Sequence, residues 1–223
     1  MGYLIAVLAA GLAIAFGASL RRAMAARAAA RARAFDQLAR RFDAFESRLQ
    51  PTGFPRATAT LAADAFDLQL VPDALAFRKL PALWLMVSLP APLPLRATLD
   101  ILARPSGLET FSGHAALPVT LPTPAFLPPG TAVRSDGEGG GVPETLVERH
   151  AGLFADARVK ELVISPKGLR IVTLLEEADR TRYLLYRDAE LGRAPVAPER
   201  VLPLCAALAA LRDDILTEAR QAA

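Results

Sequence analysis

The first twenty residues form an uninterrupted apolar stretch, because Met1 to Leu20 contain no charged side chain and Arg21 follows directly. A helix needs roughly 20 apolar residues to span a hydrocarbon core, within which it must satisfy its own backbone polar groups. A secretory signal instead carries basic residues ahead of a shorter apolar core, and no Lys or Arg precedes this one. We therefore predict a transmembrane anchor over residues 1–20, with a cleaved signal and a buried helix of a soluble protein as alternatives.

Residues 21–50 are rich in Ala and Arg and contain neither Gly nor Pro. This composition favours helix, so the membrane helix is expected to continue as a basic helical stalk. Apolar residues recur there in steps of four and three, the heptad pattern of paired helices in a coiled coil. The predicted association seam comprises Phe35, Leu38, Phe42, Phe45 and Leu49. The alternatives are packing of these residues on the protein's own downstream domain and a helix lying on the bilayer surface.

Beyond Pro51 the hydrophobic period changes from helical to alternating. Residues 66–70 alternate apolar and polar, residues 83–89 are apolar almost throughout, and residues 95–101 alternate again. These patterns predict three strands, of which the last two are joined by a proline-rich turn.

Pro, Gly, Ser and Thr dominate the segment from Ala103 to Gly141. We expect an irregular segment there with short strands over 117–121 and 131–134, and such long segments are usually functional or mobile. Pro143 suits the first position of a helix, which the apolar pattern extends to about Ala155.

Two β-rich stretches, Val159 to Ser165 and Leu169 to Leu175, predict a hairpin, and a third strand is expected over 183–186. A final helix is predicted from near Leu202. Its apolar stripe comprises Val201, Leu204, Leu208, Leu211 and Ile215. The predicted fold class is α+β: an N-terminal transmembrane helix that continues into a helical stalk, then an antiparallel sheet domain covered by helices over residues 51–223.

The formal net charge of the chain is +3, but the charge is unevenly distributed. Residues 21–50 hold eight arginines against three acidic residues, which leaves the rest of the chain at −2. A domain of that charge lacks the basic surface that binds nucleic acid, so no nucleic-acid partner is expected. Anionic lipid head groups attract juxtamembrane arginines by about 1 kcal/mol each. The predicted membrane-proximal basic residues are Arg21, Arg22, Arg27, Arg31 and Arg33.

The same arginines predict the orientation, because basic flanks stay in the cytoplasm. We expect a single-pass protein of the inner (plasma) membrane, with its N-terminus outside and its C-terminal domain cytoplasmic. The lone Cys205 excludes an internal disulfide, in keeping with a reducing compartment. The Ala, Arg, Leu and Pro bias is typical of a GC-rich bacterial gene.

Residues that could carry chemistry are scattered along the chain. His150 is expected to pack on the apolar face of its helix, whereas His114 is expected to be solvated. Cys205 is expected to be a small buried thiol. The sequence contains no CxxC, HxxxH or GxSxG pattern, and the glycines of residues 135–141 match neither a dinucleotide nor a phosphate loop. We therefore predict no catalytic, cofactor-binding or metal-binding residue, and no cofactor.

These patterns favour a membrane-anchored scaffold or recruitment protein with a non-catalytic cytoplasmic domain. Its expected partners are the lipid bilayer with its anionic head groups, and a second copy or another protein bound through the stalk. The alternative is a membrane-tethered enzyme or small-ligand receptor with a site near residues 103–141. A deep pocket on which His114, Arg134 or Asp136 converge would favour that alternative.

Overall fold

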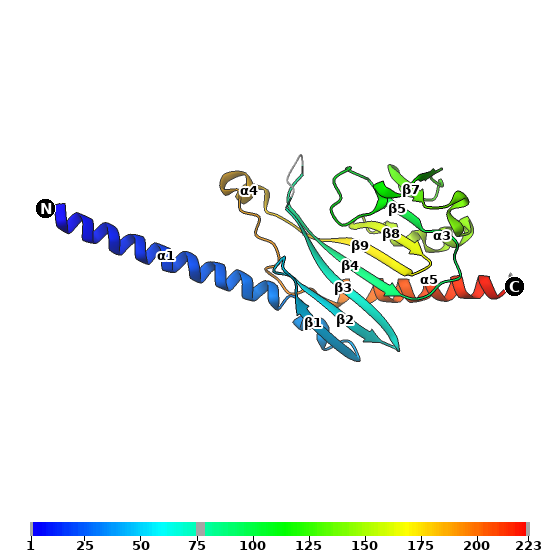
Figure 1. Ribbon diagram of the computed structural model, residues 1–223, viewed down its shortest axis with the longest axis horizontal. Coiled ribbons are helices and arrows are strands. Elements are labelled where there is room, and N and C mark those ends of the chain that lie inside the picture. Colours follow the sequence, from blue (N-terminus) through cyan, green and yellow to red (C-terminus); the bar gives the residue numbers. More distant parts are fainter. Residues whose placement is uncertain (1, 75–78, 222–223) are drawn as a thin grey trace.

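The computed structural model describes residues 2–74 and 79–221, and shows one long helix projecting from a sheet domain (Figure 1). The helices are α1 (Gly2–Ala32), α2 (Asp36–Ala39), α3 (Glu144–His150), α4 (Arg180–Tyr186) and α5 (Leu202–Gln221). Single 3-10 turns are η1 (His114–Ala116), η2 (Glu138–Gly141), η3 (Ala151–Ala155) and η4 (Pro198–Arg200).

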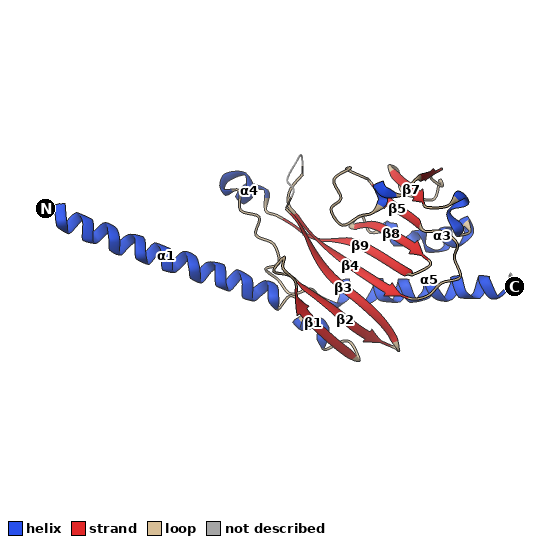
Figure 2. Ribbon diagram, in the orientation of Figure 1, coloured by secondary structure: helices blue, strands red, loops and turns tan. Residues whose placement is uncertain are grey.

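A nine-stranded sheet, antiparallel at every pairing, forms the body of the domain (Figure 2). The strands are β1 (Ala44–Leu49), β2 (Pro55–Leu61), β3 (Asp64–Asp73), β4 (Ala82–Pro90), β5 (Leu99–Ala103), β6 (Val119–Leu121), β7 (Thr131–Ser135), β8 (Val159–Ser165) and β9 (Gly168–Glu177). Their order is β1-β2-β3-β4-β9-β8-β5-β7-β6, so that β1 and β6 are the two edges. The α+β class predicted from the sequence is confirmed.

The β8–β9 hairpin is confirmed where its turn chemistry predicted it, with Ser165 paired to Gly168. Gly168 has φ +136°, and a Cβ there would collide with the Leu89 carbonyl oxygen on β4. The alternating residues 66–70 lie in β3 and residues 83–89 in β4. Local patterning was therefore sufficient where a strand pairs with its neighbour in sequence.

Two strand predictions were wrong. Residues 95–98 are not in a strand, and β4 does not form a hairpin with β5: β4 pairs with β3 and β9, whereas β5 pairs with β7 and β8. Residues 183–186 belong to α4, because both sides of β9 are already occupied by β4 and β8. Asp179 caps that helix, its Oδ1 accepting a hydrogen bond from the Arg182 amide at 2.7 Å.

One face of the sheet is apolar and carries the core. Residues at every second position of the central strands are buried there, including Leu68, Leu85 and Ile171. The final helix, which begins at Leu202 as predicted, packs against β4 and β9. Its predicted stripe is confirmed, with Val201, Leu204, Leu208, Leu211 and Ile215 all buried, and Cys205 beside them is buried too.

The prediction of a continuous helix through residue 50 was wrong. The helix ends at Ala32, and residues 44–49 form the edge strand β1. Phe35, Leu38 and Phe42 lie in the domain core, and Phe45 packs against that core. Leu49 is exposed. The heptad spacing therefore reflects packing on the protein's own domain, the second of the three interpretations. The chain bends after Ala32, and this bend places the aromatic rings in or against the domain core.

Candidate functional site

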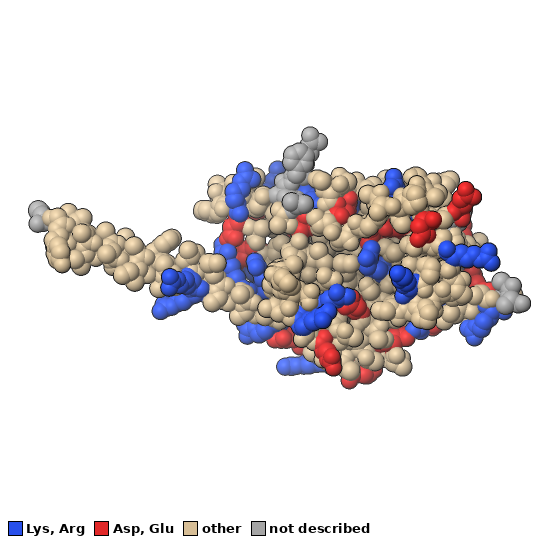
Figure 3. Space-filling view, viewed as in Figure 1, with Lys and Arg blue, Asp and Glu red and all other residues tan. Residues whose placement is uncertain are grey.

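The outer part of α1, residues 2–20, does not bury its apolar side chains against the rest of the protein. None of its described residues is buried, and Leu12 and Phe16 are 74% and 70% exposed. Within the described residues, one helical stretch, of mean hydropathy 2.2 near the N-terminus, is long and apolar enough to cross a membrane. Figure 3 shows this outer part without charged groups, and basic side chains begin where the helix approaches the domain. A buried helix of a soluble domain, one of the alternatives for this segment, is excluded within the chain.

The predicted membrane-proximal basic residues, of which Arg33 lies just after the end of α1, divide into two groups. Arg21, Arg22 and Arg33 are exposed, whereas Arg27 and Arg31 turn toward the domain. The guanidinium of Arg27 donates two hydrogen bonds to the Asp188 carboxylate, at 3.1 and 3.0 Å, and its Nε lies 3.2 Å from Glu190 Oε1. Arg31 Nε donates to the Leu191 carbonyl oxygen at 3.3 Å.

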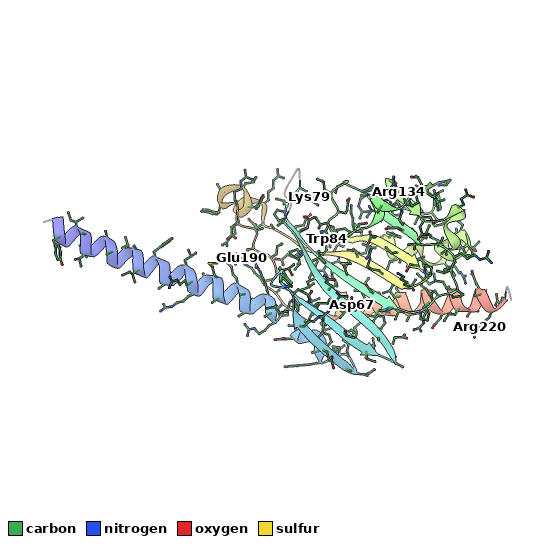
Figure 4. The ribbon with its side chains drawn as sticks, in the orientation of Figure 1. Asp67, Lys79, Trp84, Arg134, Glu190 and Arg220 are labelled. Atoms are coloured by element: carbon green, nitrogen blue, oxygen red, sulfur yellow. The ribbon has the colours of Figure 1, made fainter. Side chains whose placement is uncertain are left out.

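The segment between α4 and α5 receives these contacts, and Figure 4 places Glu190 on the side of the domain from which α1 projects. Arg182 adds ion pairs to Asp188 at 3.1 Å and to Glu190 at 2.9 Å. Burial opposes ionisation of Asp188, but hydrogen bonds from Arg27 and Arg182 hold its pKa below the ordinary value. We call the contacts of Arg27 and Arg182 with Asp188 and Glu190 the latch, because they join the base of α1 to the domain.

A glycine allows the segment between α4 and α5, which carries the latch carboxylates and which we call the latch segment, to pass close to α1. Gly192 has φ +75°, and a Cβ there would lie 2.6 Å from Cε1 of Phe54 and 3.2 Å from Cγ of Arg31. Its amide donates to the Glu176 carboxylate at 2.8 Å, which ties the segment to the end of β9. The guanidinium of Arg31 also lies over the Phe54 ring, 5.2 Å from its centroid.

Helix α4 stands apart from the rest of the domain, on the same side as α1 (Figure 1). Its last three residues are large, apolar or aromatic, and exposed: Leu184 56%, Leu185 69% and Tyr186 74%. A groove of about 1050 Å³ separates it from α1. Phe16 and Leu20 line the groove on the α1 side, and Leu185 and Tyr186 line it on the α4 side. Two arginines and two aspartates line it as well: Arg182, Arg193, Asp179 and Asp188.

A second feature is a cluster of ionisable groups on the opposite face of the sheet, where Glu161 pairs with the buried Leu102 and Val172. Asp100 on β5 and Glu161 on β8 are 2% and 0% exposed. Arg170 on β9 donates to Glu161 Oε2 at 3.1 Å, and the Ser112 hydroxyl donates to Glu161 Oε1. His114 closes the cluster from the loop above, with its Nδ1 3.1 Å from Asp100 Oδ1.

Burial controls ionisation in this cluster. It raises the pKa of Asp100 to about 7 against the opposing charge of Arg170. Burial, together with the charge of Asp100, raises the pKa of Glu161 to about 7. Burial and the positive charge of Arg134 lower the pKa of His114. The cluster therefore contains two carboxyl groups that hold protons near neutral pH.

The prediction that His114 is solvated was wrong, because it is only 7% exposed. Convergence of His114, Arg134 or Asp136 on a pocket, which would have favoured the alternative function, is not observed. Arg134 donates to the carbonyl oxygens of Ala115 and Leu117, and Asp136 accepts from the Thr98 amide at 2.6 Å. None of the five cavities described for this structure is lined by His114, Arg134 or Asp136. The buried cluster can hold a proton, but it offers no opening to a substrate at any of those cavities.

A cavity of about 220 Å³ does lie beneath the segment from residue 103 to 141, on the core side of the sheet. Its lining is apolar apart from Glu144 and includes Leu121, Leu127 and Val133. His150 packs near the end of α3, with its Nε2 3.0 Å from Asp214 Oδ2 on α5. Within the described residues, no group of three or more His, Cys, Asp or Glu side chains could hold a metal ion.

The sheet edge formed by β1 is open. Five of its six residues are exposed, and it pairs with β2 alone. A groove of about 450 Å³ lies beside it, lined by charged and polar side chains from the first three strands together with apolar residues that include Phe66 and Pro90. Arg56 and Asp67 form a two-point ion pair in this groove, with both hydrogen bonds at 2.7 Å.

Sequence reasoning missed the latch, the exposed end of α4 and the buried carboxyl groups. The only signal for the latter was the position of Asp100 and Glu161 inside strongly apolar strands. No protein-family model matches the sequence, and no curated protein and no solved structure matches the chain.

Proposed function

We propose that the protein is a single-pass, membrane-anchored scaffold or recruitment protein whose cytoplasmic domain is non-catalytic. The observation that carries the proposal is the contrast within α1. Its outer part buries no described residue within the chain, whereas its base is joined to the domain through the latch. An apolar helix that finds no partner in its own domain is stabilised by lipid, and a fixed base holds the domain beside the bilayer.

The orientation proposed is N-terminus outside and domain in the cytoplasm of the inner (plasma) membrane. Arg21 and Arg22 support it, because they are exposed directly after the apolar stretch and can contact anionic head groups. Arg27 adds little to lipid binding, since the latch already occupies its guanidinium.

The proposed recruitment surface is the β1 edge with its neighbouring groove. An edge strand presents unpaired backbone amides and carbonyls that can pair with an extended segment of another protein. Glu46 and Arg48 place both signs of charge along this edge, which would select the partner by charge. The buried seam residues Phe35, Leu38 and Phe42 are not offered to a partner.

A photo-cross-linking amino acid at residue 47, which is exposed on β1 between the two charges, tests the recruitment surface in native membranes. The matched control is residue 120, which is exposed on the opposite edge strand β6. We expect a discrete cross-linked protein from residue 47 only, and we expect its loss when Glu46→Arg and Arg48→Glu exchange the two charges along the β1 edge. Equal capture at both edges, or capture that survives the charge reversal, would contradict the assignment.

A second candidate function, binding of a small apolar ligand, is favoured by the cavity of about 220 Å³ beneath residues 103–141. Val133→Trp would fill that cavity. If the cavity binds ligand, this substitution should abolish the retention of small apolar molecules by the purified protein. Retention unchanged by the substitution would exclude this function.

A further inference from the structure

The exposed end of α4 has no function within the domain. Outside α1, five large hydrophobic side chains among the described residues are exposed, and three of them are consecutive in α4. An isolated exposed leucine is normal, but three adjacent large side chains on one short helix form a patch that requires an occupant.

The part of α1 that lies beside α4 identifies that occupant. The groove beside α4 is lined by Phe16 and Leu20, which form the last turn of α1 before the first arginine. Leu185 and Tyr186 face the same groove. A bilayer that contains the outer part of α1 would therefore reach α4 at the depth where acyl chains meet head groups.

The composition around α4 fits that depth. Tyr side chains are enriched at membrane interfaces, because an apolar ring and a polar hydroxyl suit the boundary between acyl chains and water. Arg180 begins α4 and Arg187 follows its last residue; both are exposed, so they can meet lipid phosphates. The guanidinium of Arg187 lies over the Tyr183 ring, 5.6 Å from its centroid.

The latch fixes α4 at this level. Arg182, within α4, and Arg27, on α1, bind the same two carboxylates, Asp188 and Glu190. The short helix therefore cannot change depth independently of α1 without separating these ion pairs.

We propose that α4 is a second membrane contact: Leu184, Leu185 and Tyr186 insert at the head-group boundary of the leaflet from which α1 emerges, with a phospholipid in the groove between the two helices. Anionic head groups of the same leaflet meet Arg180 and Arg187. The inference rests on the proposed anchoring by α1. Two points of contact restrict the tilt of the domain relative to the bilayer, so that the β1 edge keeps one orientation toward the cytoplasm.

Depth-dependent fluorescence quenching tests this contact in the full-length protein. The protein, carrying Cys205→Ala, is reconstituted in vesicles of phosphatidylcholine and phosphatidylglycerol. A polarity-sensitive fluorophore is attached to Leu185→Cys, and spin-labelled lipids at shallow and deep positions serve as quenchers. Leu12→Cys reports the span, and Leu49→Cys, an exposed leucine on β1, is the matched control.

The three sites separate the possible outcomes. We expect deep-label quenching at residue 12, quenching by the shallow label at residue 185 at least about twofold stronger than at residue 49, and a blue shift at 185 that weakens without phosphatidylglycerol. Quenching at residue 12 with equal signals at 185 and 49 would overturn the α4 contact alone. Absence of quenching at residue 12 would overturn the anchoring as well. A blue shift at 185 without quenching would overturn lipid contact and assign the patch to a second copy of the chain.

Discussion

The two long helices of this protein, α1 and α5, are both rich in apolar residues, but these residues lie in different environments. In α5 the apolar residues form one stripe, and Leu204, Cys205, Leu208, Leu211 and Ile215 are buried against the sheet. In the outer part of α1 they surround the helix, and none of the described ones is buried. The helix whose apolar residues form one stripe packs on the domain, whereas the helix that is apolar all round, and more apolar along its length, stays available to lipid.

The largest effect is expected when one leucine in each helix is truncated to alanine. Leu208→Ala should lower the free energy of unfolding by about 2–5 kcal/mol, because it leaves a cavity at a fully buried position. Leu12→Ala should change it by less than about 0.5 kcal/mol, since that side chain contacts no core. Urea unfolding in mild detergent, followed by Trp84 fluorescence, measures both. Equal losses would mean that α1 also packs within the protein.

Changes in pH should alter the stability of the domain but not that of the outer part of α1, because among the described residues only the domain holds buried titratable groups. The pKa values of Asp100 and Glu161 are both raised to about 7, so the folded state keeps protons that the unfolded chain releases near its ordinary values. The stability that this protonation contributes is complete below about pH 4 and is lost as the pH rises to about 7.

Glu161→Gln cannot ionise, so it should gain about 1–3 kcal/mol relative to the wild type between pH 4.5 and 7.5. Glu109, whose pKa is lowered to about 2 by Ser106 and Lys160 against burial, contributes equally to both proteins and cancels in the difference. Urea unfolding at several pH values measures the difference. A constant difference across this range would show that Glu161 is ionised in the folded protein.

Two glycine substitutions compare the base of α1, where Gly192 approaches it, with the outer part, which contains Gly11. Gly192→Ala should cost about 1–2 kcal/mol, because the new methyl group meets Phe54 and Arg31 at a positive φ. Gly11→Ala should be neutral or slightly stabilising, since nothing lies within 4 Å of its added Cβ. Thermal unfolding of both variants would reveal the contrast, and tolerance of Ala at position 192 would indicate that the latch segment is loosely packed.

The smallest effect is expected from the latch itself. Arg27→Ala removes ion pairs to Asp188 and Glu190 that are partly exposed, so it should cost less than about 1 kcal/mol and matter less at high salt. Its clearer consequence is greater motion of α1 relative to the domain, measurable by spin labels at residues 20 and 185. Arg21→Ala, which lies on an exposed part of α1, is the control. Unchanged distance distributions in Arg27→Ala would show that other contacts hold α1.

Much of the fold followed from hydrophobic periodicity. The β8–β9 hairpin, the buried side of β3 and the stripe of α5 were predicted correctly, because each depends on neighbours in sequence. Residues 183–186 were mistaken for a strand, because their tyrosine and leucine side chains suit a strand and the local sequence carries no information that β9 is already paired on both sides.

The seam residues show a similar limit. Phe35, Leu38 and Phe42 have heptad spacing, but the chain bends after Ala32, and the interior of the domain buries them. Tertiary packing overrode a helical propensity that remained favourable as far as residue 50. The candidate site could be predicted only in part: the arginine cluster was evident, whereas the carboxylates that bind Arg27 lie about 160 positions away along the chain.

The central claim is that the outer part of α1 spans a membrane and leaves the domain on its arginine-rich side. The most direct measurement compares two fusions after Ala223 in cells, one to alkaline phosphatase and one to green fluorescent protein. The account predicts a fluorescent fusion in the membrane fraction and an inactive phosphatase, because the phosphatase folds only outside the cytoplasm. An active phosphatase with a dark fluorescent fusion would contradict it and place the domain on the other side of the membrane.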